Sequence, residues 1–102
     1  MSRRLELHAE LEKLLGSKNV YFQPPESFKL HYPCFIYKVD TGDTQYANDM
    51  PYIFKRRYQV MYITKNPDDE LIDKIAMSIQ TIRFDRSYTA DNLNHYVYNL
   101  YY

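Results

Sequence analysis

Tyrosine and phenylalanine dominate the apolar part of this sequence and limit how it can fold, with 12 Tyr, 5 Phe and no Trp among 102 residues. A tyrosine side chain has a large flat apolar body and one polar tip, which suits half-buried surfaces and interfaces. So many tyrosines in so short a chain cannot all lie in a dry core with hydrogen-bonded hydroxyl groups. We therefore expect a Tyr-rich sheet, and two interpretations stay open: a face partly wetted by solvent, or a contact surface for another protein.

Two segments carry the apolar spacing of amphipathic helices. Leucines recur at three- and four-residue intervals across residues 3–15, and Gly16 follows as a C-cap. Residues 66–70 combine an Asn cap, a Pro and three acids, which is typical of a helix start. Apolar residues then recur on one face. We predict helices over 3–15 and 67–79.

Period-2 alternation predicts the strands. The predicted strands cover 33–40, 53–65, about 82–88 and 95–102, with a turn at 89–92 and a short extended segment at 19–23. The resulting order is α-β-β-α-β-β, with an extra strand near Val20. It predicts one α+β domain over 1–102, with a mostly antiparallel four- to five-stranded sheet and two helices packed on one face.

Few residues could carry catalysis or bind metal, and none has the spacing for it. His8, His31 and His95 share no metal-ligand spacing with one another or with Cys34. Cys34 is the only cysteine and lies in an apolar run, so we expect a buried, inert thiol. We predict no catalytic residue, no cofactor and no metal site, and we expect that the protein is not an enzyme.

The charge balance argues against a dedicated nucleic-acid binder. Thirteen basic and 13 acidic residues give a formal net charge of zero, so the basic footprint of such proteins is missing. The one basic run, 55–57, is interpreted as a solvated strand edge or an interface. An RNA-binding sheet with exposed aromatics is the main rival from another class. The charged amino-terminal segment and the short apolar runs predict a soluble protein without membrane contact.

A long polar segment, 41–51, separates two predicted strands and borders the basic run. Loops of this length in compact domains are commonly functional or disordered. We predict that residues 41–57, together with outward-pointing tyrosines of the last strand, carry contacts between subunits. The candidate contact residues are Tyr46, Asp49, Met50, Tyr52, Lys55, Arg56, Arg57, Tyr98 and Tyr102.

Several stretches together resemble a group of small tail proteins of long-tailed bacteriophages and prophages. These stretches are the Leu-rich opening helix, Val20–Ser27, Tyr32–Tyr37, Tyr58–Val60 running on to Asp68, and Phe84–His95. The likeness covers nearly the whole chain. Its motifs are structural, so they point to a family more specifically than to a role.

Within that group the layout is similar to a tail terminator, also called a tail completion protein. The resemblance implies a hexameric ring of this chain that ends the tail tube and offers the surface for joining the head. It implies as partners the tail tube protein and head–tail connector proteins, and it implies a place at the head-proximal end of the tail, after assembly in the bacterial host cytoplasm. A head-side connector or stopper ring subunit is the alternative, and no diagnostic residue separates the two.

Overall fold

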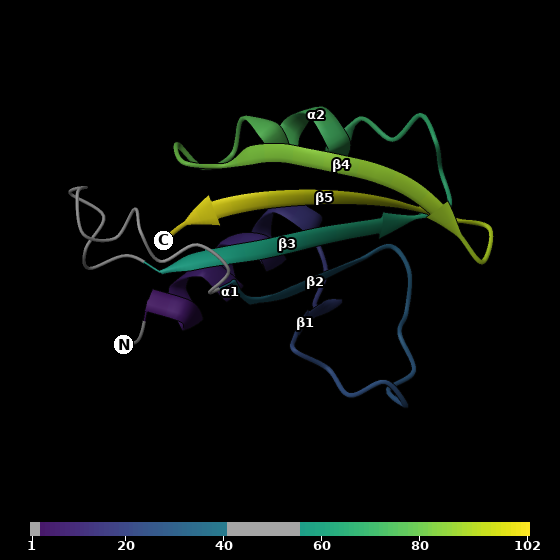
Figure 1. Ribbon diagram of the computed structural model, residues 1–102, viewed down its shortest axis with the longest axis horizontal. Helices are drawn as coiled ribbons and strands as arrows, with labels where there is room; N and C mark the ends of the chain where they lie inside the picture. Colours follow the sequence, from purple (N-terminus) through teal and green to yellow (C-terminus); the bar gives the residue numbers. More distant parts are fainter. Residues whose placement is uncertain (1–2, 41–55) are drawn as a thin grey trace.

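The computed structural model describes residues 3–40 and 56–102, which form an α+β arrangement with a five-stranded sheet and two helices (Figure 1). The element order is α1 (Arg3–Leu15), β1 (Val20–Phe22), β2 (Cys34–Val39), β3 (Arg57–Thr64), α2 (Leu71–Ala76), β4 (Arg83–Ala90) and β5 (Leu93–Tyr101). This confirms the predicted α+β class. Neither described helix is long and apolar enough to cross a membrane.

The sheet is mixed, because one of its pairings is parallel. Its strand order is β1-β2-β3-β5-β4. β1 runs parallel to β2, whereas the β2–β3, β3–β5 and β5–β4 pairs are antiparallel. The connection from 23 to 33 returns the chain to the end of the sheet where β1 began, as a parallel pair requires. β3 is central, which explains why its later part is apolar on both faces.

The core lies against the face of the sheet that carries Phe35, Val60 and Tyr98. On this face the register places Val60 between Tyr37 of β2 and Tyr98 of β5. The helices add Leu7 and Leu11 from α1 and Ile75 from α2 to the same buried cluster, and each of the three is fully buried. Gly16 ends α1 with a φ of 79°, the left-handed conformation that favours glycine at a helix end.

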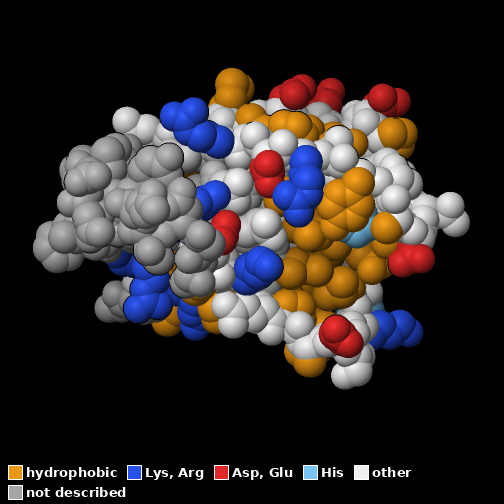
Figure 2. Space-filling model, in the orientation of Figure 1, with side chains coloured by type: hydrophobic (Ala, Val, Ile, Leu, Met, Phe, Trp, Pro, Cys, Tyr) orange, Lys and Arg blue, Asp and Glu red, His pale blue; other side chains and the backbone are white. Residues whose placement is uncertain are grey.

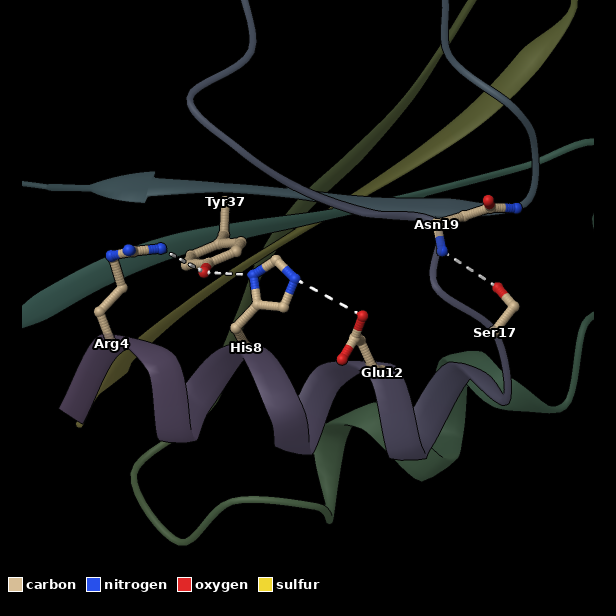
Figure 3. A network of polar contacts seen from close by, with 6 residues as sticks. All are labelled: Arg4, His8, Glu12, Ser17, Asn19 and Tyr37. Atoms are coloured by element: carbon tan, nitrogen blue, oxygen red, sulfur yellow. Dashed lines mark hydrogen bonds and ion pairs between the residues drawn. The ribbon is translucent and has the colours of Figure 1, made fainter. Parts of the chain in front are cut away.

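Four tyrosines, Tyr37, Tyr58, Tyr62 and Tyr98, lie in this core at 1% exposure or less. Three of them have hydroxyl partners, which makes their burial tolerable. The Tyr37 hydroxyl lies 2.7 Å from Nδ1 of His8 and accepts a 3.4 Å hydrogen bond from Arg4, both residues of α1 (Figure 3). Tyr62 donates to the Asp69 carboxylate, and Tyr98 donates to the carbonyl of Ile72 at 3.0 Å. Aromatic residues thus supply more of the core than the sequence suggested.

The second helix is shorter than predicted: α2 covers Leu71–Ala76 rather than 67–79. The polar residues that predicted an earlier helix start form hydrogen-bonded turns instead. The side-chain oxygen of Asn66 accepts from the backbone N–H of Asp68 at 3.0 Å, and that of Asp69 accepts from the N–H of Leu71, also at 3.0 Å. Such local bonds compete with helix formation, so the helix begins only after Asp69.

The predicted final hairpin is present, with a tighter turn. Only Asp91 and Asn92 lie between β4 and β5, and their φ angles are 53° and 62°. Two positive φ angles are typical of the type I′ turn, which Asn and Asp tolerate better than most residues. Thr89 and Ala90, placed in the turn by the sequence pattern, therefore belong to β4.

Candidate functional site

The candidate surface is the face of the sheet opposite the core, which we call the open face. Cross-strand pairing arranges its side chains in rows. The row nearest the β4–β5 turn holds Cys34, Ile63, His95 and Tyr88; the next holds Tyr21, Ile36, Met61, Val97 and Arg86; a third holds Lys38, Gln59, Asn99 and Arg83. The open face therefore has an apolar half, made by the first two rows, and a polar half.

Aromatic contacts build the surface of the apolar half. The ring of Tyr88 stacks on His95, with centroids 4.7 Å apart and planes 8° apart, and the Tyr88 hydroxyl approaches the Met61 sulfur at 3.7 Å. On β1, Tyr21 packs against Phe28 with centroids 5.0 Å apart. Tyr88 and Phe28 are 41% and 45% exposed. Figure 2 shows hydrophobic side chains gathered around a histidine on this face.

A shallow groove of about 410 Å³ borders the apolar half where the 23–33 connection passes β2. Its walls are the 23–30 segment on one side and Ile36, Lys38 and Val39 on the other. The side-chain oxygen of Gln23 accepts from the N–H of Val39 at 3.2 Å and so holds the connection to the strand. The groove is mainly apolar and offers Lys38 as a cation at its rim.

The polar half of the open face carries charges of both signs. In this half Arg57 pairs with Asp40 at 3.4 Å, and at the β4 end of the second row Arg86 pairs with Asp85 at 2.6 Å. Both pairs are partly exposed, so each adds little to stability. These charges keep the edges of the open face hydrated, which suits the rim of a contact.

Five of the nine predicted contact residues, Tyr46, Asp49, Met50, Tyr52 and Lys55, lie outside the described residues.

Three others meet at one end of the sheet. The backbones of Arg56 and Tyr102 exchange hydrogen bonds of 3.2 and 3.0 Å, which extend the β3–β5 pairing. Arg57 follows as the first residue of β3, and the guanidinium of Arg3 lies 5.2 Å from the centre of the Tyr102 ring. Their role in subunit contacts stays a prediction.

The prediction that Tyr98 points outward is wrong. Its register opposite Val60 places it on the core face, where it is 1% exposed and packs edge-to-face on Phe84. Burial raises the pKa of the Tyr98 hydroxyl to about 12. Because the side chain is buried in the core cluster, we remove it from the candidate contacts.

The described residues show little that could perform chemistry. No group of three or more His, Cys, Asp or Glu side chains within 3–40 and 56–102 is arranged to hold a metal ion. Cys34 is fully buried, and burial raises the pKa of its thiol to about 12, which suppresses the reactive thiolate. The apolar and aromatic side chains of the open face are suited to binding by contact.

The sequence pattern contained part of the signal for the open face. Alternation already separated Ile36 from Phe35 and Met61 from Val60, and the structure keeps those assignments. The pattern did not show which side the core takes in β5, nor that Phe28 of the connection comes to lie beside Tyr21. Both depend on pairing between distant segments.

Comparison with known proteins identifies no relative: no family model, no curated protein and no solved structure matches the chain.

Proposed function

We propose that this chain is a structural subunit of a long-tailed bacteriophage that assembles into a ring, with the role of a tail terminator. In this proposal the ring is hexameric, ends the tail tube at its head-proximal end and joins the head through connector proteins. The role is a non-enzymatic one in the virion. The resemblance of the sequence supports the family, and the open face supports an assembly role.

The observation that carries the assembly role is the apolar half of the open face. We propose that both helices pack on the core face, which leaves Tyr21, Met61 and Tyr88 on the other side for protein contact. A monomeric protein seldom exposes a contiguous aromatic patch with a polar rim unless something binds there. In a ring each subunit needs two different complementary patches, and the groove beside β2 and the Tyr88–His95 stack offer two such regions.

A head-side connector or stopper ring subunit of the same particle remains the alternative position. It would use the same open face, so the two positions differ in the neighbour that the ring binds. Binding of the purified protein to isolated tail tubes, compared with its binding to isolated heads, separates them.

One observation favours a second function, an RNA-binding sheet. Exposed aromatics lie on the same face as Lys38, Arg83 and Arg86, and single-stranded RNA binds by stacking on such rings beside cations. The neutral net charge disfavours it. Titration with labelled single-stranded RNA at low salt would reveal this activity.

The test of the ring is native mass spectrometry and light scattering of the full 12.4 kDa chain over a wide concentration range. We expect a discrete hexamer, free in solution or formed on isolated tail tubes. A chain that stays monomeric and also fails to bind tail tubes would refute the proposal.

A matched pair of variants tests whether the open face makes the contact. Met61→Lys places a charge in the apolar half and is expected to remove the hexamer, whereas Met77→Lys changes a methionine that is 82% exposed at the end of α2 and should leave it intact. Circular dichroism confirms that both variants fold. Equal assembly of the two would show that the contact lies elsewhere.

A further inference from the structure

We propose that β4 is a pairing edge for a second copy of this chain, whose own β4 adds antiparallel to it. The two five-stranded sheets would then form one continuous sheet across a two-fold axis. This contact goes beyond the proposed ring, because a two-fold contact cannot by itself close a ring of head-to-tail subunits. It follows from the geometry of β4 and does not rest on the proposed function.

β4 is exposed along its whole length. All eight residues of Arg83–Ala90 are exposed, although the strand lies beside β5, where Val97, Tyr98 and Leu100 are buried. It is the last strand in the sheet order and pairs with β5 alone among the described strands. The other edge of a strand in this position presents unpaired N–H and C=O groups, which readily pair with another chain.

The opposite edge of the sheet is protected throughout, whereas β4 is protected only in its first half. β1 has only three residues, and the chain leaves it through Gln23, with a φ of 45°, into Pro24 and Pro25. Short edge strands and prolines are the usual protection against edge pairing. β4 carries charges only in its first half, at Arg83, Asp85 and Arg86, and a bulge between Phe84 and Arg86. The stretch from Ser87 to Ala90 has neither.

The hairpin determines which backbone groups point away from β5. Ala90 and Leu93 flank the two-residue turn as a hydrogen-bonded pair, and such pairs alternate along the ladder. Ala90, Tyr88 and Arg86 thus direct their backbone groups to β5. Ser87 and Thr89 direct theirs to the open edge, so a second strand would bond to these two residues.

One register of two β4 strands puts facing side chains on the same side of the sheet and avoids placing like charges opposite each other. With Ser87 on the two-fold axis, each Arg86 lies opposite Tyr88 of the second copy, both on the open face. Arg86 has a side chain 57% exposed and Tyr88 is 41% exposed, so each guanidinium can cover the facing ring. A register shifted toward the start of β4 would place Arg86 against Arg86. The neutral chain adds no long-range repulsion between copies.

Cross-linking at the axis tests this pairing. In Ser87→Cys the two new thiols would lie directly opposite each other, within the span that a disulfide can bridge. Mild oxidation of the full-length protein is expected to give a disulfide-linked dimer on a non-reducing gel. Cys34 is fully buried and does not compete, which the wild-type protein verifies.

Thr89→Cys is the matched control, because Thr89 is exposed on the same face of the same strand. In the proposed register its copies lie four residues apart along the strands, about 13 Å, and should not cross-link. Absence of a Ser87→Cys dimer, or equally fast cross-linking of Thr89→Cys, overturns the pairing. As a second measurement, Ser87→Pro removes an outward N–H and is expected to halve the native mass relative to the wild type, because the two-fold contact is lost, while the melting temperature stays near that of the wild type. A native mass equal to that of the wild type also overturns the pairing.

Discussion

At the scale of single residues, Asp69 links the sheet to the start of α2. Its carboxylate accepts hydrogen bonds from the hydroxyls of Tyr62 and Thr64 and from the N–H of Leu71. Burial tends to raise the pKa of this carboxyl, but the bonds from Tyr62, Leu71 and Thr64 favour the charged form, and the net effect lowers the pKa below its usual value near 3.8. Charge-assisted bonds of this kind are stronger than neutral ones.

A lowered folded-state pKa has a defined effect on stability. The unfolded chain binds the proton more readily, so the contribution of Asp69 is fully present above about pH 4 and is lost as the pH falls through the folded-state pKa. Asp69→Asn is expected to lower the free energy of unfolding by about 1 kcal/mol at pH 7 and to flatten its decline below pH 4. Urea unfolding at pH 7 and at several acidic values measures both effects.

Asp68→Asn is the control for this prediction. Asp68 is exposed, and its backbone N–H bonds to Asn66. We expect its unfolding curves to follow those of the wild type at each pH. An Asp69→Asn protein with unchanged acid dependence would show that the carboxylate does not stabilise the fold.

Tyr37 gives a second residue-scale prediction. Its hydroxyl joins β2 to α1 through His8 and Arg4, and the other ring nitrogen of His8 lies 3.7 Å from Glu12 (Figure 3). Tyr37→Phe keeps the ring and removes these contacts, so we expect a loss of about 1 kcal/mol in the free energy of unfolding. Chemical denaturation compares it with the wild type. An unchanged midpoint would contradict a stabilising role for the network.

At the scale of elements, the sequence pattern predicted the helices and strands whose formation depends on neighbouring residues. The leucine spacing and Gly16 predicted α1 with the bounds that the structure has, and alternation predicted β2, β3 and the final hairpin. The start of α2 was predicted too early because Asn66 and Asp69 bond within turns. The parallel β1–β2 pair and the inward side of Tyr98 depend on contacts between distant segments, which periodicity does not contain.

The same limits apply to the candidate site. Basic residues 55–57 and an outward tyrosine were predicted from composition and alternation. The open face instead lies where β1, β2, β3 and β5 pair side by side on the side opposite the core, and the 23–33 connection brings Phe28 beside Tyr21. The local sequence pattern does not predict that Phe28 and Tyr21 lie next to each other.

The packing of α2 provides the element-scale prediction. Ile75 is fully buried in the core cluster, whereas Met77, two residues later, is 82% exposed. Ile75→Asp buries an unpaired charge and is expected to unfold the domain, while Met77→Asp should melt close to the wild type. Circular dichroism melting of the pair measures this. A folded Ile75→Asp protein with wild-type melting would contradict the core placement of α2.

At the scale of the whole molecule, the proposed ring makes a prediction about salt. In the proposed ring the contacts made by Tyr21, Met61 and Tyr88 are apolar, and apolar burial does not weaken with ionic strength. Contacts to RNA would release counterions, so their affinity would fall steeply as salt rises. The proposed ring and the RNA-binding alternative therefore predict opposite responses.

We expect the hexamer fraction at a fixed protein concentration to be the same or higher in 1 M sodium chloride than in 50 mM. Light scattering after size-exclusion chromatography measures it, and Met61→Lys serves as the assembly-deficient reference. The charge pairs Arg57–Asp40 and Arg86–Asp85 lie within the subunit, so their screening has little effect on contacts between subunits. Dissociation of the ring in high salt would mean that charge pairs between subunits, rather than the apolar half of the open face, hold it together.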